Sequence, residues 1–127
     1  MTPSLYETIS QGNALMSITA RKAQEECDNP EKVKFYASEL RKTVLSLRQI
    51  SESQFSPEGK QSYFGILSEI DDIASRLAKE CDDPDNVMIL TGRTKGLFYL
   101  IGEVLHGERP EIRGKSFWET IKERFKK

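Results

Sequence analysis

The sequence predicts an all-α protein, an up-down-up-down four-helix bundle built from two similar helical hairpins and followed by a short C-terminal amphipathic helix. Three observations support this prediction. Apolar residues recur every three or four positions through most of the 127 residues, as they do on one face of a helix. A turn signature occurs twice, at an offset of 54 residues. The connections between the helical segments are short, which makes neighbouring helices antiparallel.

The first hairpin is predicted to begin at Thr2 and Pro3, a capping residue followed by proline in the first turn. Its first helix carries a stripe of apolar or small residues, which are Leu5, Ile9, Gly12, Met16, Ala20, Ala23 and Cys27. The second helix begins at Asn29 and Pro30 and ends near Ser51. Its inward stripe consists of Val33, Tyr36, Ala37, Leu40, Val44 and Leu47.

The second hairpin follows a loop over residues 53–59 and begins at Ser56 and Pro57. The stripe of its first helix consists of Tyr63, Ile66, Leu67, Ile70, Ala74, Leu77 and Cys81. Asp83 and Pro84 begin the last long helix. This helix carries Val87, Leu90, Leu97, Ile101, Val104 and Leu105.

Three glycines of the last long helix have predicted roles. Gly107 follows His106 at the end of the helical pattern, where we expect it to cap the helix. Gly92 and Gly96 lie one turn apart on one helix face. Because glycine within a helix costs about 1 kcal/mol, we expect these two to serve a close approach between helices.

The two hairpins share sequence as well as pattern. Residues 19–33 read TARKAQEECDNPEKV and residues 73–87 read IASRLAKECDDPDNV, with six identities in fifteen positions. Convergence is one explanation, since helical turns favour Asp-Pro and Asn-Pro, but duplication explains the extent better. The predicted organisation is a bundle over 1–106, with repeat units of about 3–52 and 57–106, and then a basic linker and helix over 107–127.

Composition limits the location and the partners. The chain has 19 Lys+Arg against 20 Asp+Glu, so its net charge of -1 provides no overall attraction to nucleic acid or membranes. The longest apolar run is Leu97 to Ile101, which predicts no membrane span, and the start lacks a secretory signal. Cys27 and Cys81 are too few for a disulfide scaffold or a zinc site. We therefore expect a cytoplasmic protein.

The sequence offers little for catalysis, so we expect no enzyme, no cofactor and no metal. His106 is the single histidine, and the GxSxG, HExxH and GxGxxG motifs are absent. Both turns between helices are acidic, and their residues are Glu26, Asp28, Glu31, Glu80, Asp82, Asp83 and Asp85. We interpret these acids as helix caps and as partners of helix N-termini. A metal-dependent enzyme that uses this acidic cap is the third interpretation of the function.

The C-terminal segment differs from the rest of the chain. Residues 109–127 contain seven basic and three acidic residues. Ser116 and Glu119 form a capping box that predicts a short helix with an apolar face of Phe117, Trp118, Ile121 and Phe125. The basic residues are Arg109, Arg113, Lys115, Lys122, Arg124, Lys126 and Lys127. Because a helix of about ten residues is marginal alone, it must dock on its own bundle or on a partner.

These features favour a non-catalytic helical adaptor or assembly subunit. Its expected partner is another protein or a second copy of the chain, bound through Phe117, Trp118, Ile121 and Phe125. The alternative is a nucleic-acid-binding accessory protein. In that case the seven basic residues of the C-terminal segment contact phosphates, with help from Arg41, Lys42 and Arg48.

Overall fold

The computed structural model describes residues 1–50 and 52–108, and this part of the chain is all-helical, with no strand. Its long helices are α1 (Pro3–Glu25), α2 (Pro30–Arg48), α3 (Pro57–Lys79) and α4 (Pro84–Gly107). A short 3-10 helix, η1 (Glu52–Gln54), lies between α2 and α3. The all-α class predicted from the apolar periodicity is therefore confirmed for the described residues.

All four long helices begin as predicted. The N-cap residues are Thr2, Asn29, Ser56 and Asp83, and each side chain accepts a hydrogen bond from a backbone N–H of the first turn. Proline follows each cap, where its missing N–H leaves no helical hydrogen bond unmade. One local signal, a short polar residue before proline, thus marks the start of each of the four long helices in the described residues.

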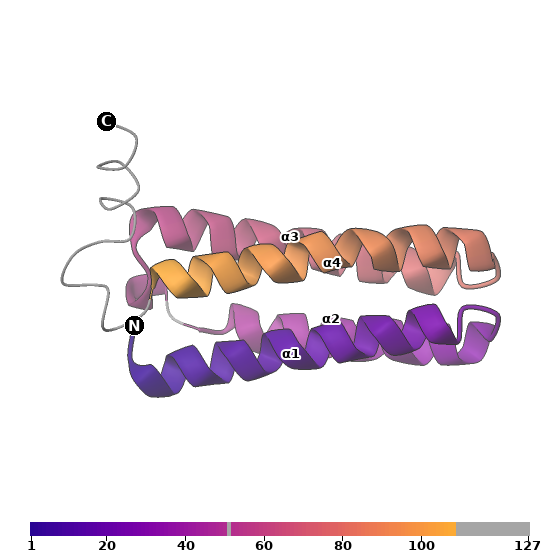
Figure 1. Ribbon diagram of the computed structural model, residues 1–127, viewed down its shortest axis with the longest axis horizontal. Helices are drawn as coiled ribbons and strands as arrows, with labels where there is room; N and C mark the ends of the chain where they lie inside the picture. The colour runs from indigo at the N-terminus through magenta and orange to yellow at the C-terminus, as the bar shows by residue number, and fades with distance from the viewer. Residues whose placement is uncertain (51, 109–127) are drawn as a thin grey trace.

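The helices pack lengthwise into a bundle (Figure 1). Helix α1 packs against α2 and α4, and α3 packs against the same two helices. Figure 1 shows the α1–α2 turn and the α3–α4 turn together at one end, with the N-terminus at the other. The core between the helices is closely packed, and its fully buried side chains include Ile9, Met16, Val33, Leu40, Leu67, Ile70, Leu90 and Ile101.

An aromatic cluster closes the end of the core opposite the two turns. Phe55 stacks on Tyr63 with ring centroids 4.6 Å apart, and Phe64 packs edge-on against both rings. The hydroxyl of Tyr63 donates to the carbonyl oxygen of Leu47 at 2.9 Å. Burial raises the pKa of the Tyr63 phenol above its usual range, so the hydroxyl stays protonated as a donor. Phe55 lies in a segment that the sequence predicted as a loop, so its place in the core was missed.

All four long helices end differently from the prediction. Helices α1 and α3 end at Glu25 and Lys79, before Cys27 and Cys81, which the predicted stripes included. Helix α2 ends at Arg48, before Ser51, and Gly107 belongs to α4 rather than capping it. The C-cap of α4 is Glu108, whose φ of -98° is an ordinary value for any residue. Its backbone N–H bonds to the carbonyl oxygens near the helix end, which makes a left-handed glycine unnecessary.

Glu108 ties the end of α4 to the start of α3. It is 1% exposed, and its Oε1 accepts hydrogen bonds from the backbone N–H of Ser56, at 2.9 Å, and from the Ser56 hydroxyl. Gly59 makes room for this carboxylate, because a Cβ at that position would lie 2.1 Å from Glu108 Oε1. A negative group at the N-terminus of α3 also suits the helix dipole. The buried glutamate is thus a structural anchor.

Candidate functional site

The residues predicted to bind partners lie outside the described residues. This applies to the apolar set Phe117, Trp118, Ile121 and Phe125, and to the basic set Arg109, Arg113, Lys115, Lys122, Arg124, Lys126 and Lys127. Among the helpers expected for nucleic acid, Arg41, Lys42 and Arg48 are described, and all three lie on α2. A site on the described residues must therefore come from the two turns or from the surface of the bundle.

The acids of the first turn hold that turn together. Lys32 Nζ donates to Glu26 Oε1 at 2.8 Å, and the Tyr36 hydroxyl donates to Glu26 Oε2. These two hydrogen bonds lower the pKa of the Glu26 carboxyl below its usual range, and the bond from Lys32 has the larger effect. The bond to Glu26 also raises the pKa of Tyr36. Glu26 therefore has structural partners, which are two side chains of α2 rather than the helix N-terminus that the capping interpretation expects.

The second turn has hydrogen bonds similar to those of the first. Glu80 Oε1 accepts from Asn86 Nδ2 at 3.0 Å and Glu80 Oε2 accepts from Arg76 Nε at 3.1 Å. Asn86 occupies the position equivalent to Lys32, 54 residues further along the chain. Within residues 1–50 and 52–108, no three or more His, Cys, Asp or Glu side chains group as a metal site would require. Cys27 is half-buried and Cys81 is buried, and neither is in a disulfide.

The outward side of α4 is the most apolar exposed surface in the described part of the chain. Eight large hydrophobic residues are exposed in the described part of the chain, and four of these eight lie on α4. Their exposed fractions are 45% for Met88, 61% for Ile89, 68% for Tyr99 and 47% for Leu100. Together they expose on the order of 400 Å² of mostly apolar surface, a size that often marks an interaction site.

Gly92 and Gly96 lie at the centre of this surface. The expectation that they serve a close approach between helices of the same chain is wrong for the described residues, because a Cβ added at either position would meet nothing within 4 Å. By contrast, a Cβ at Gly12 would lie 2.9 Å from Leu47 Cδ2. We call the surface formed by Met88, Ile89, Gly92, Gly96, Tyr99 and Leu100 the α4 outer face.

The equivalent face of α2 is more polar than the α4 outer face. Lys34, Ser38, Lys42 and Ser46 stand, at the offset of 54, where α4 has Met88, Gly92, Gly96 and Leu100. Exposed apolar residues stand at equivalent positions of both helices in only two cases. These are Phe35 with Ile89, and Leu45 with Tyr99. The apolar periodicity of the inward stripes does not reveal the α4 outer face. A comparison of residues 54 positions apart contains the signal.

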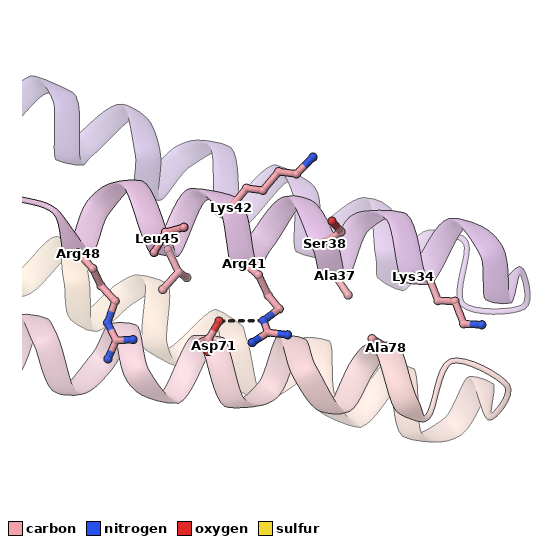
Figure 2. A pocket seen from close by; sticks show the side chains of 10 residues that line it. Lys34, Ala37, Ser38, Arg41, Lys42, Leu45, Arg48, Asp71 and Ala78 are labelled. Atoms are coloured by element: carbon pink, nitrogen blue, oxygen red, sulfur yellow. Dashed lines mark hydrogen bonds and ion pairs between the residues drawn. The ribbon is translucent and has the colours of Figure 1, made fainter.

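The second surface feature is a groove of about 480 Å³ between α2 and α3 (Figure 2). Four cationic side chains line it, and we call it the basic groove: Lys34, Arg41, Lys42 and Arg48. Arg41 Nε pairs with Asp71 Oδ1 at 3.1 Å, and Arg48 donates to the Ser68 hydroxyl at 2.6 Å. Figure 2 shows both arginines reaching toward α3 while Lys42 points away from it.

Comparisons with known proteins assign no function: no family model, no curated protein and no solved structure matches this chain. None of the helices in residues 1–50 and 52–108 is long and apolar enough to cross a membrane. The chemistry of the two surfaces is therefore the basis for a functional proposal.

Proposed function

We propose that this protein is a non-catalytic helical adaptor or assembly subunit that binds another protein through the α4 outer face. The observation that carries the proposal is the exposure of Met88, Ile89, Tyr99 and Leu100 around two glycines with open space above them. A cytoplasmic location is part of the proposal.

The energetics of α4 support an external partner. Each mid-helix glycine destabilises a helix by about 1 kcal/mol relative to alanine. At Gly92 and Gly96 no contact within the described residues offsets this, because the space above both is open. A helix from a partner could approach the backbone closely there and cover the flanking apolar side chains. The equivalent α2 face has lysine or serine at four of its six positions, so the hairpin itself does not require the apolar residues and glycines that α4 has there.

The proposal includes the finer architecture, in which two hairpins related by duplication form an up-down-up-down bundle. The matching hydrogen bonds of the two turns support it. Burial at equivalent positions also agrees: Val44 and Phe98 are both buried, and Leu45 and Tyr99 are both exposed. The C-terminal amphipathic helix, with Phe117, Trp118, Ile121 and Phe125, is proposed as a second partner-binding element.

A capture experiment with matched variants tests the adaptor function. The tagged full-length chain is used to capture proteins from a lysate of its native host, with and without nuclease. We expect the Ile89→Glu/Tyr99→Glu variant to lose the captured proteins. The Phe35→Glu/Leu45→Glu variant changes the equivalent positions on α2, which are 58% and 61% exposed, and should keep them. Equal capture by both variants would contradict the role of the α4 outer face.

The C-terminal element is tested separately in the same assay. Replacing Trp118 and Phe125 by Asp should reduce capture if this segment contributes to binding. Helical content, measured by circular dichroism, should stay unchanged in every variant, so that a loss of capture reports a lost contact. Unchanged capture would remove the C-terminal segment from the binding surface and leave the α4 outer face as the proposed site.

The basic groove favours a second candidate function, the binding of nucleic acid. Four cations line one side of the groove, and Asp71 is the single acid among its lining residues. Seven further basic residues follow in the C-terminal segment. Phosphate contacts by such residues weaken steeply as the salt concentration rises. A fluorescence anisotropy titration with short DNA and RNA at 50 and 200 mM salt tests this.

A charge reversal in the groove makes that titration specific. Lys42→Glu/Arg48→Glu should abolish binding, whereas Lys95→Glu, on the exposed side of α4, should leave it nearly unchanged. The absence of binding by the unmodified chain at low salt would exclude this second function.

A further inference from the structure

We infer that the α4 outer face binds the same face of a second copy of this chain, with the two α4 helices antiparallel about a two-fold axis midway between Gly92 and Gly96. The inference rests on the proposed function and names its partner. In a two-fold interface, residue i of one copy contacts residue j of the other, and residue j contacts residue i. The surface must therefore be complementary to itself under that rotation.

The α4 outer face meets this requirement. Its residues form three pairs, two of large side chains and one of glycines, about the position of Thr94: Met88 with Leu100, Ile89 with Tyr99, and Gly92 with Gly96. Both members of every pair are exposed. A two-fold axis therefore pairs Met88 with Leu100 and the two glycines with each other along one row of each helix, and Ile89 and Tyr99 flank that row.

Helix geometry places these pairs correctly. Thr94 is 0% exposed and faces the core, so the outermost line of α4 runs opposite it. Residues at equal separations before and after Thr94 lie at equal angles on either side of that line, because each residue turns the helix by about 100°. Met88 and Leu100 are each six residues from Thr94, about 9 Å along the axis. Rotation about the axis thus brings Leu100 of the second copy level with Met88 of the first, on the opposite side of the contact line. A crossing that aligns the row Met88, Gly92, Gly96 and Leu100 of one helix with the same row of the other brings the two side chains into contact.

The glycines and the charges indicate how the two helices cross. Open space at Gly92 and Gly96 lets the two backbones approach closely at the centre. Asp85 and Glu103 are exposed at equal separations from Thr94, so an antiparallel pair brings like charges together at both ends. Crossing near -50°, a preferred angle for packed helices, separates these ends while the central contact remains. We therefore expect an oblique crossing rather than alignment along the full length of α4.

The size of the surface predicts a weak dimer. The four apolar side chains expose on the order of 400 Å² per copy, about half of the ~800 Å² that each partner buries in a stable interface. We expect the dimer at roughly tens of micromolar chain, with rapid exchange.

Disulfide trapping tests the arrangement directly. The full-length chain with Cys27→Ala and Cys81→Ala receives either Met88→Cys or Leu100→Cys, and the two single variants are oxidised mildly, alone and mixed. The antiparallel pair predicts a covalent dimer mainly in the mixture, at least tenfold more than in either variant alone. A bridge within one chain is impossible, because each variant carries a single cysteine.

The first hairpin provides the matched control. Lys34→Cys mixed with Ser46→Cys places thiols at the equivalent positions of α2 and should give no dimer above background. A covalent dimer from Met88→Cys alone would indicate parallel helices and overturn the inference. Equal yields from the α2 and α4 mixtures would overturn it as well, because random collision would then explain both.

Sedimentation equilibrium separates the second copy from other occupants. As its concentration rises from about 5 to 200 µM, the average molar mass of the unmodified chain should approach that of a dimer. The Gly92→Gln/Gly96→Gln variant should keep the molar mass of a monomer. Glutamine favours helix more than glycine does, so this variant should fold at least as well. A monomer at all concentrations would overturn the inference, whether or not capture from lysate still requires Ile89 and Tyr99. If Trp118→Asp alone allowed dimers, the chain's own residues 109–127 would occupy the face, and the inference would also fail.

Discussion

Helices α2 and α4 hold equivalent positions in the two hairpins, and they are alike inside and different outside. Both follow the same turn, begin with a polar cap and proline, and bury matching residues such as Leu47 and Ile101. On the outside, lysines and serines of α2 are replaced by apolar residues and glycines in α4. Core packing constrains the inner positions of both helices equally, so the outer difference must have a different cause. The proposed binding of a partner to the α4 outer face would account for it.

The largest effects should come from the positions where the two helices agree. Leu47→Ala and Ile101→Ala remove buried side chains at equivalent positions, which are 4% and 0% exposed. Each substitution should lower the free energy of unfolding by about 2–5 kcal/mol, from lost burial and the cavity left behind. Urea unfolding followed by circular dichroism measures both. If only one substitution were destabilising, the inner faces of α2 and α4 would not be equivalent.

Substitutions at the ends of the two hairpins should lower stability less than these core substitutions, and by unequal amounts. Glu108→Ala removes the acceptor of both Ser56 hydrogen bonds and should cost about 1–3 kcal/mol in the same urea assay. The equivalent residue of the first hairpin is Gln54, which is only half-buried. Gln54→Ala should therefore change stability by less than about 0.5 kcal/mol. Similar losses for both would show that the buried carboxylate adds nothing to the α3–α4 hairpin.

Gly59 reports on the same anchor. A Cβ at Gly59 would collide with Glu108 Oε1, so Gly59→Ala should also be destabilising. Combined with Glu108→Ala, it should cost little more than the single change, because the colliding group is gone. Full additivity of the two losses in urea unfolding would contradict this explanation of the glycine.

The glycines of the α4 outer face should behave in the opposite way. Gly92→Ala and Gly96→Ala should each raise the free energy of unfolding by about 0.5–1 kcal/mol at low micromolar chain, where α4 is unpartnered. Ser38→Ala, at the position of α2 equivalent to Gly92, should change it by less than about 0.5 kcal/mol. A loss of stability at either glycine would show that the space above it is filled, and that the α4 outer face is not available to a partner.

The fold could be predicted from local signals, because capping residues, prolines and apolar steps of three or four determine where each helix begins and which side it buries. The anchor between Glu108 and Ser56 could not, since it joins residues 52 positions apart and a buried glutamate resembles a surface residue in sequence. The α4 outer face was missed for a different reason. Apolar periodicity identifies the inward stripe, whereas exposed Ile89 and Tyr99 are recognised only once the core is known. The amphipathic helix expected in the C-terminal segment lies outside the described residues and stays a prediction.

The smallest expected effect distinguishes the two turns through pH. Tyr36 has no hydroxyl counterpart in the second hairpin, where Leu90 is the equivalent residue. The hydrogen bonds from Lys32 and Tyr36 lower the pKa of Glu26, so their contribution is present above the usual value of 4.5 and is lost as the pH falls below it. The raised pKa of Tyr36 has the opposite consequence, a contribution present below pH 10 and lost at higher pH. The free energy of unfolding of Tyr36→Phe, measured in urea, should therefore be lower than that of the unmodified chain at pH 7. The difference between the two free energies should be smaller at pH 3. A gap that stayed constant between pH 7 and pH 3 would show that Tyr36 stabilises the first turn through packing rather than through the ionised Glu26.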